Sequence, residues 1–232
     1  MAKICRYYQR HVVIQEAPED TPIDCAELDR RLAEDSQITH VAAVYCETTS
    51  GILNPLADIA GIVARYQRHL LIDAMSAFGA LPLDASRIPF TAVVASSNKS
   101  LEGVPGLGFC LVHESALRAA RGQSPSLSLD VHDQWQELEI NGQWRFTPPT
   151  HVILAFEQAL YEFYQEGGVA GRGGRYQAYC NPLVQGLRAL GFKPLLPDEL
   201  QAPIIVTFHM PENPNFLFNT FYDRLRQRGY VI

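Results

Sequence analysis

One lysine and one aspartate, each at the end of an apolar run, are the residues whose types and spacing could do chemistry in this chain. Lys99 follows the run 91–95, and Asp73 ends the run 70–73. Charged side chains at the ends of buried strands are costly unless they are paired or used. A pyridoxal phosphate site needs both residues: a lysine that forms a Schiff base and an acid that keeps the pyridine nitrogen protonated. The alternative is that both residues only end strands and face solvent, where polar residues normally begin.

The elements that must position these residues alternate between strand and helix. Short apolar runs predict strands at 41–45, 69–72, 91–95 and 108–112. A helix is predicted between the first two strands, at 56–69. This alternation indicates an α/β domain with a mostly parallel sheet. Ligands of such sheets bind beyond the carboxyl ends of the strands, which is where Thr48, Asp73 and Lys99 all fall.

The second half of the chain reads as mainly helical. Apolar residues at helical spacing predict helices at 150–166, 175–190 and 215–228. Between the first two helices, the glycine-rich residues 171–174 predict a further flexible stretch. An apolar run predicts a strand at 203–208.

Composition excludes several classes of protein. The chain has 232 residues, of which 47% are hydrophobic, so it can bury a substantial core. Its net charge is −6, no basic stretch suits nucleic acid, and no run approaches the ~20 apolar residues of a membrane span. The 5 cysteines never take CxxC spacing, and no signal peptide is visible, which favours a cytoplasmic protein with reduced thiols. The 7 histidines show no metal-ligand spacing, so we expect no metal site.

Five segments of the chain resemble the class V aminotransferases in order and spacing. They are Cys46–Pro55, Asp73–Gly79, Ser97–Lys99, Ser126–Asp130 and Trp144–His151. The last two resemble in particular the members that move an amino group from 2-aminoethylphosphonate to pyruvate. The resemblance runs over essentially all 232 residues.

The resemblance implies a fold and a division into domains. The expected fold is the type I fold of pyridoxal phosphate-dependent transferases, an α/β fold whose mostly parallel sheet has helices on both faces. Residues 1–190 would form part of the large cofactor-binding domain, and residues 191–232 the start of a small α+β domain. The family's phosphate-binding turn and ring-stacking aromatic would lie upstream of Met1, and its substrate arginine downstream of Ile232. We therefore expect an internal piece of the enzyme, truncated at both ends.

The resemblance also assigns roles to three residues at the strand ends. Lys99 would bind pyridoxal 5′-phosphate and act as the general base. Asp73 would hold the pyridine nitrogen as a cation, although it could instead cap the turn that follows it. Thr48 would donate a hydrogen bond to the cofactor's phenolic oxygen, although threonine is also common at the end of a strand.

Further residues are expected to bind the phosphate. Asn98 matches a family position that reaches this group, and Ser96 and Ser97 are weaker candidates. Thr147 resembles a residue that crosses a homodimer interface to the neighbouring subunit's phosphate. The alternative for Thr147 is an ordinary position in a loop kept extended by the proline that follows it.

The function that the resemblance implies is transamination of 2-aminoethylphosphonate with pyruvate, which gives phosphonoacetaldehyde and alanine. Another class V reaction, such as alanine–glyoxylate transamination, is an alternative. A cysteine desulfurase is disfavoured, because no cysteine lies in a loop with a clear activating neighbour. A non-catalytic remnant is the third alternative, and we expect the 232-residue chain alone to be inactive.

Overall fold

The computed structural model describes residues 1–231 of the chain. The strands are β1 (His40–Val44), β2 (His69–Asp73), β3 (Ala92–Ser96) and β4 (Gly108–Val112). The helices are α1 (Ala2–Tyr7), α2 (Cys25–Glu34), α3 (Leu56–Arg65), α4 (Glu114–Ala119), α5 (Val131–Asn141), α6 (Thr150–Gln165), α7 (Gly168–Ala189) and α8 (Phe218–Gln227). The four strands predicted from the sequence are all present, with ends shifted by about one residue.

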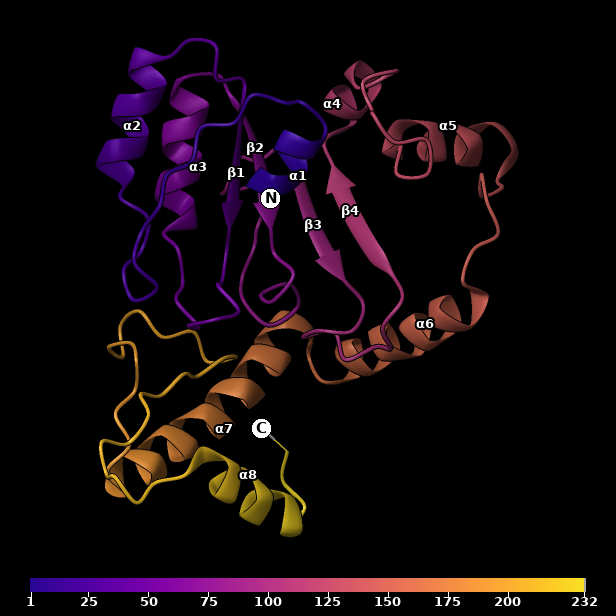
Figure 1. The fold of residues 1–232 in the computed structure, drawn as a ribbon. Helices are drawn as coiled ribbons and strands as arrows, with labels where there is room; N and C mark the ends of the chain where they lie inside the picture. Colours follow the sequence, from indigo (N-terminus) through magenta and orange to yellow (C-terminus); the bar gives the residue numbers. More distant parts are fainter. Residues whose placement is uncertain (232) are drawn as a thin grey trace.

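The sheet has the order β1-β2-β3-β4. Strands β1, β2 and β3 pair in parallel, and β4 runs antiparallel to β3, so the prediction of a mostly parallel sheet is confirmed. In register, Val44 pairs with Asp73, and Asp73 pairs with Val94. The carboxyl ends of the three parallel strands therefore meet at one edge, on the side of α6 and α7 (Figure 1).

One face of the sheet packs against α3 and forms the core. Its central residues are Leu70, Ile72, Val93 and Ala95, each only 1% exposed. Successive strand residues point to opposite faces. The other face is covered less completely, because Val94 in the middle of β3 keeps 40% of its surface exposed.

A buried asparagine connects the end of β1 to the start of α3. The Asn54 side chain donates a hydrogen bond to the Val44 carbonyl oxygen at 2.9 Å and accepts one from the Ile23 amide at 3.2 Å. Helix α3 ends at Arg65, so the predicted helix over 56–69 is too long. The chain leaves the helix because Gln67 takes a φ of 55° and His69 already belongs to β2.

The glycine-rich stretch at 171–174 is helical, so the prediction of a flexible break there is wrong. Helix α7 runs without interruption over Gly168–Ala189. A Cβ at Gly171 would overlap the Glu166 carbonyl oxygen, and a Cβ at Gly173 would overlap the Ala80 carbonyl oxygen. These glycines therefore allow close backbone contact rather than flexibility.

The predicted strand at 203–208 is also absent from the described residues, which hold only the isolated bridge between Pro194 and Phe208 there. The segment instead lies on the loop after β1: Ala202 donates to the Gly51 carbonyl oxygen at 3.0 Å, and Thr207 donates to the Thr49 carbonyl oxygen at 2.9 Å. Pro203 has no N–H to donate to a ladder.

The other two predicted helices of the second half are present. Helix α6 matches the prediction over 150–166, and α8 is shorter than the predicted 215–228. Helix α7 ends at Ala189, next to the expected boundary at residue 190, and the division into two domains stays a prediction. No helix in the described part of the chain is long and apolar enough to cross a membrane.

Candidate active site

Three loops meet at the carboxyl edge of the sheet through one serine. The Ser76 hydroxyl lies 2.7 Å from the Thr48 hydroxyl oxygen, and the Ser100 hydroxyl donates to the Ser76 carbonyl oxygen at 3.1 Å. Thr48 follows β1, Ser76 follows β2 and Ser100 follows β3. Ser76, 8% exposed, therefore joins the segments that carry Thr48, Asp73 and Lys99. The sequence offered only its place within Asp73–Gly79 as a signal for this role.

Asp73 caps the turn that follows it and still presents a carboxylate to the site. Its Oδ1 atom accepts a hydrogen bond from the Met75 amide at 3.0 Å. No other hydrogen bond to this carboxylate occurs within residues 1–231. Burial, and then the charge of Asp73, raise the pKa of Glu47. The cap and the predicted role toward a pyridine nitrogen are therefore compatible, because each can use its own oxygen.

Lys99 lies in the turn directly after β3. The turn is closed by a hydrogen bond from the Glu102 amide to the Lys99 carbonyl oxygen at 2.8 Å. The Lys99 side chain is exposed and makes no ion pair with any residue that the structure describes. An amine in this state is accessible to a carbonyl compound, as covalent catalysis requires.

Of the polar residues next to Lys99, one bonds within the protein and two have side chains without a hydrogen-bond partner in the described chain. The Ser97 hydroxyl donates to the Val104 carbonyl oxygen at 2.7 Å, so it is already used to fix the loop after β3. The Ser96 hydroxyl is buried and has no partner within the described chain. Asn98 is exposed, and its side chain takes part in no hydrogen bond described for residues 1–231. Ser96 and Asn98 are thus free to bind a ligand, whereas Ser97 is occupied.

Thr147 is not joined to this group of residues. It lies in the exposed segment before α6, and no hydrogen bond links its side chain to another residue in the described region. The neighbouring Arg145 anchors the segment by donating to the Leu127 carbonyl oxygen at 2.9 Å. The structure therefore leaves the predicted role of Thr147 untested.

The residues at the carboxyl edge fit pyridoxal phosphate. Lys99 offers an accessible amine, Asp73 a carboxylate with one oxygen still available, and Thr48 a hydroxyl group. The Ser96 hydroxyl adds a buried polar group without a hydrogen-bond partner in the described chain, and a bound ligand could supply that partner. These are the functional groups that the cofactor's aldehyde, ring nitrogen and oxygens would need.

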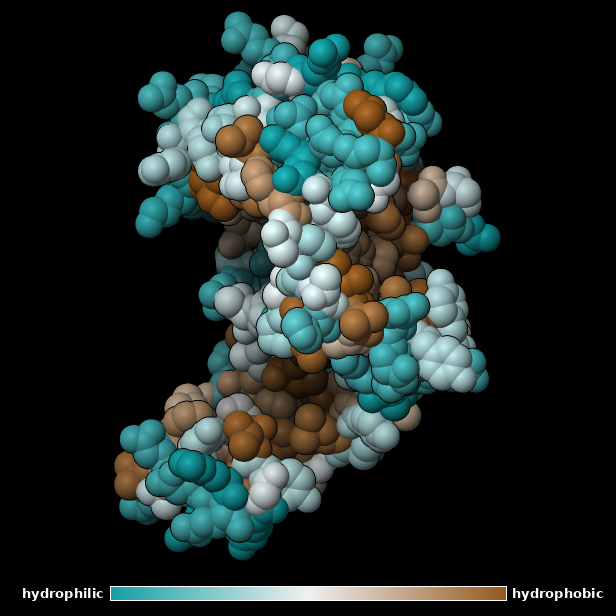
Figure 2. Space-filling model, turned by 90° about the vertical axis from the view of Figure 1, so that its right-hand side faces the viewer, coloured by the Kyte–Doolittle hydropathy of each residue, from teal (hydrophilic) through white to brown (hydrophobic). Residues whose placement is uncertain are grey.

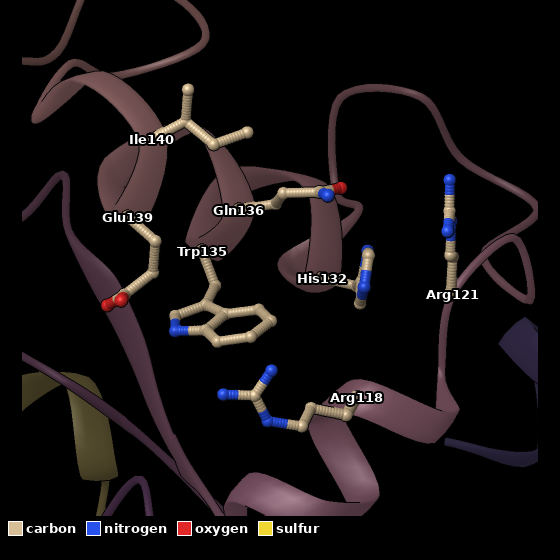
Figure 3. A pocket seen from close by; sticks show the side chains of 7 residues that line it. All are labelled: Arg118, Arg121, His132, Trp135, Gln136, Glu139 and Ile140. Atoms are coloured by element: carbon tan, nitrogen blue, oxygen red, sulfur yellow. The ribbon is translucent and has the colours of Figure 1, made fainter.

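A hollow lies between α4 and α5, near the amino ends of the parallel strands and therefore away from the carboxyl edge of the sheet (Figures 1 and 3). Its volume is about 380 Å³, and it is lined by Arg118, Arg121, His132, Trp135, Gln136, Glu139 and Ile140. Beside it, possible ligand atoms of Asp130, His132 and Asp133 lie within 4.8 Å of one another. However, Asp130 caps α5, and an Arg145 nitrogen lies 3.5 Å from Asp133. Both carboxylates therefore already have partners within the protein, and we assign no metal site to this cluster.

The sequence of the chain is similar to known transaminases over its whole length. The family model described as aminotransferase class V matches residues 1–223. The chain is 51% identical over 232 residues to 2-aminoethylphosphonate–pyruvate transaminase 2 of Burkholderia lata. It is 50% identical over 232 residues to a 2-aminoethylphosphonate–pyruvate transaminase of Pseudomonas putida. The chain covers 62% and 63% of these two relatives, which is less than two thirds of their length.

Solved structures match the fold closely. Ureidoglycine–glyoxylate aminotransferase from Bacillus subtilis superposes with a TM-score of 0.86 at 21% identity, over 100% of this chain and 60% of that one. Pyridoxamine–pyruvate aminotransferase from Mesorhizobium loti gives a TM-score of 0.80 at 25% identity, over 88% of this chain and 53% of that one. The predicted α/β fold is confirmed.

Proposed function

Because this chain belongs to the class V aminotransferase family, we propose that it carries the pyridoxal phosphate centre of a transaminase. The observation that carries this proposal is the convergence of Thr48, Asp73 and the Lys99 loop around Ser76 at one edge of the sheet. When bound, pyridoxal phosphate supplies an electron sink for the carbon that bears the amino group.

The chain's own residues would bind and orient this group and move the proton. Lys99 would hold the cofactor and then act as the base that carries a proton to and from the substrate carbon. Asp73 would hold the ring nitrogen as a cation with its free carboxylate oxygen. Thr48 would orient the ring by a hydrogen bond, while Ser76 keeps the threonine hydroxyl in place. Asn98 would bind the phosphate, and Ser96 is a further candidate for this group.

We propose 2-aminoethylphosphonate and pyruvate as substrates, with phosphonoacetaldehyde and alanine as products. The support is the name shared by relatives that are about 50% identical over the whole chain. Alanine–glyoxylate transamination is the weaker candidate, because neither of these two relatives carries that name.

We further propose that the intact protein works as a homodimer in which Thr147 reaches the partner's phosphate. The support is that Thr147 is exposed and has no partner within residues 1–231. Apolar surface also gathers around the middle of the face on the β4 and α6 side of the molecule (Figure 2). On α6, Leu154 is 64% exposed and Tyr161 is 59% exposed. Apolar surface of this kind is typical of an interface.

A chimera tests whether this chain supports the proposed reaction when the segments beyond it are supplied by a relative. This chain replaces the matching 232 residues of the Pseudomonas putida relative, which supplies the remaining segments. We expect the chimera to form alanine from 2-aminoethylphosphonate and pyruvate, and to do so at least about tenfold faster than it forms glycine from alanine and glyoxylate. The Lys99→Ala chimera is the matched control and should form none. Equal rates with both substrate pairs would contradict the substrate assignment, and turnover without Lys99 would contradict the mechanism.

A further inference from the structure

The turn that carries Lys99 has a backbone shape that its own sequence does not favour. Glu102 takes a φ of 60°, in the left-handed region that glycine usually occupies. The turn is closed internally by the bond from the Glu102 amide to the Lys99 carbonyl oxygen and by one from the Gly103 amide to the Ser97 carbonyl oxygen, both 2.8 Å long. A residue in this region persists when the surrounding structure holds it there.

Arg172 on α7 is the group that holds the turn from outside. It is the largest fully buried side chain of the described residues, with 2% of its surface exposed. Its Nη1 atom donates to the Ser100 carbonyl oxygen at 2.6 Å and lies 3.4 Å from a Glu102 carboxylate oxygen. Its Nε atom donates to Glu166, and its guanidinium lies 5.5 Å from the centre of the Phe163 ring. A buried guanidinium is tolerated only with partners of this kind.

A second layer of charged groups completes this arrangement. Arg175 donates to Glu102 at 2.7 Å and to Glu166 at 2.5 Å, and the Tyr176 hydroxyl donates to Glu102 at 2.7 Å. Hydrogen bonds from Arg175, and then from Arg172, keep the pKa of Glu166 below its usual range. Two arginines therefore face two carboxylates, and the pKa of each carboxylate lies below its usual range.

The backbone of α7 is placed so that this contact can form. Gly173 packs against the Ala80 carbonyl oxygen at a distance that no side chain would allow. Gly171 has the same relation to the Glu166 carbonyl oxygen. The first half of α7 thus lies against the segment after β2 through Gly173 and against the turn after β3 through Arg172.

We propose that Arg172 is a positioning residue that fixes the Lys99–Glu102 turn and so directs the Lys99 amine toward the site. This inference rests on the proposed function, since it takes Lys99 as the reactive amine. Within the described residues, the polar contacts of the Arg172 guanidinium go to Ser100, Glu102 and Glu166. Because Arg172 belongs to α7, the conformation of the Lys99–Glu102 turn depends on the position of α7.

A purely structural role for Arg172 makes a different prediction. If Arg172 only stabilised the packing of α7, its loss would loosen the whole molecule and lower the melting temperature. If it fixes the turn, its loss would release residues 99–103 while the core strands stay protected. Local and global opening can be separated by amide hydrogen exchange.

The test measures hydrogen exchange of the 232-residue chain without cofactor. Arg172→Met keeps a long apolar side chain and removes every donor. We expect exchange of the Glu102 and Gly103 amides to accelerate at least about tenfold, with β2 and β3 unchanged. The matched control is Arg188→Met on the same helix, which removes an exposed pair with Asp198 and should leave the turn unaffected. Unchanged exchange in the turn, or uniform acceleration across the sheet, would overturn the inference.

A second variant decides the matter if Arg172→Met does not fold. Glu102→Gln keeps the size of a side chain that is 40% exposed and removes the charge that both arginines face. It should accelerate exchange at residues 99–103 at least about threefold, again without change in β2 and β3. An unaffected turn in this folded variant would also overturn the inference.

A separate measurement, the labelling of lysines by pyridoxal phosphate, shows whether the proposed function itself is wrong. The same samples are treated with pyridoxal phosphate and borohydride, and the modified lysines are mapped, with Lys3 and Lys193 as internal references. We expect selective modification of Lys99 in the parent chain and at least about fivefold less of it in Arg172→Met. No selectivity in the parent chain would refute the assignment of Lys99, while the exchange data would still decide whether Arg172 fixes the turn.

Discussion

The turn at residues 99–102 and the segment at residues 142–149 both carry residues expected to reach the same cofactor, and they are held very differently. The turn is tied to the loop after β2 by Ser100 and to α7 by the buried Arg172. The segment with Thr147 is mostly exposed and is anchored mainly through Arg145. The difference shows that contacts within one chain order the turn that carries Lys99, whereas they leave Thr147 in a largely exposed segment.

The largest effect is expected at Asp73, on the ordered side of this comparison. Asp73→Asn can still accept the hydrogen bond from the Met75 amide, so the turn should survive. It cannot hold a ring nitrogen as a cation, and we expect turnover of the chimera to fall at least ~100-fold, about 2.7 kcal/mol of lost stabilisation. The exposed Asp84→Asn is the control, measured in the same alanine assay. Near-normal turnover would mean that Asp73 serves only as a cap.

A smaller effect is expected at Thr48. Thr48→Val keeps the shape of the side chain and removes the hydroxyl that lies 2.7 Å from Ser76. We expect cofactor affinity to weaken roughly tenfold, since one hydrogen bond at the upper end of the usual range contributes about 1.4 kcal/mol. Absorbance titration of the variant with pyridoxal phosphate measures this change. The control is Thr49→Val, because the Thr49 hydroxyl has no hydrogen-bond partner in the described chain. An equal loss of cofactor affinity in both variants would contradict the proposed contact between Thr48 and the cofactor.

Thr147 allows a test across the interface. Thr147→Ala should lower the turnover of the chimera about threefold to tenfold through loss of one hydrogen bond. In mixed dimers of the Thr147→Ala and Lys99→Ala chimeras, one site would keep both native residues. Its turnover per intact Lys99 should then return to the parent value. If turnover stays at the Thr147→Ala level, Thr147 acts within its own chain or not at all.

The smallest effect is expected on stability, from the pH dependence of the ion pairs that Glu166 makes. Hydrogen bonds from Arg175 and Arg172 hold the pKa of Glu166 below its ordinary value of 4.5. A lowered carboxyl pKa contributes stability that is fully present above pH 4.5 and lost as the pH falls through the folded-state pKa. Glu166→Gln keeps an oxygen that can accept from Arg172 but removes the charge, so it should lower the melting temperature at pH 7 by about 4 °C, and the difference should shrink toward pH 3. A difference independent of pH would argue against the ionic contribution.

Much of the sheet could be predicted from the sequence because its strands are short apolar runs bounded by polar residues. The glycines of α7 could not be interpreted correctly, because their sequence does not say whether a glycine provides freedom or close contact. Gly171 and Gly173 provide close contact. The run at 203–208 resembles a strand in composition, but it lies on the loop at Thr49 and Gly51 instead of pairing in a ladder.

The candidate site was predictable to a similar degree. The strand-end positions of Thr48, Asp73 and Lys99 follow from chain order alone once the sheet is parallel. The connecting role of Ser76 and the buried Arg172 did not follow, since both depend on contacts between residues far apart in the sequence. The roles of Asn98 and Thr147 stay predictions.

The most direct test of the central claim is the site of covalent attachment. The chain contains only three lysines, Lys3, Lys99 and Lys193, so each serves as a reference for the others. The 232-residue chain is incubated with pyridoxal phosphate, reduced with borohydride, digested and mapped by mass spectrometry. We predict that the pyridoxal group is found on Lys99 and that Lys99→Ala abolishes both the label and the visible absorbance that precedes it. Equal labelling of all three lysines, or labelling of Lys3 or Lys193 in preference, would contradict the account.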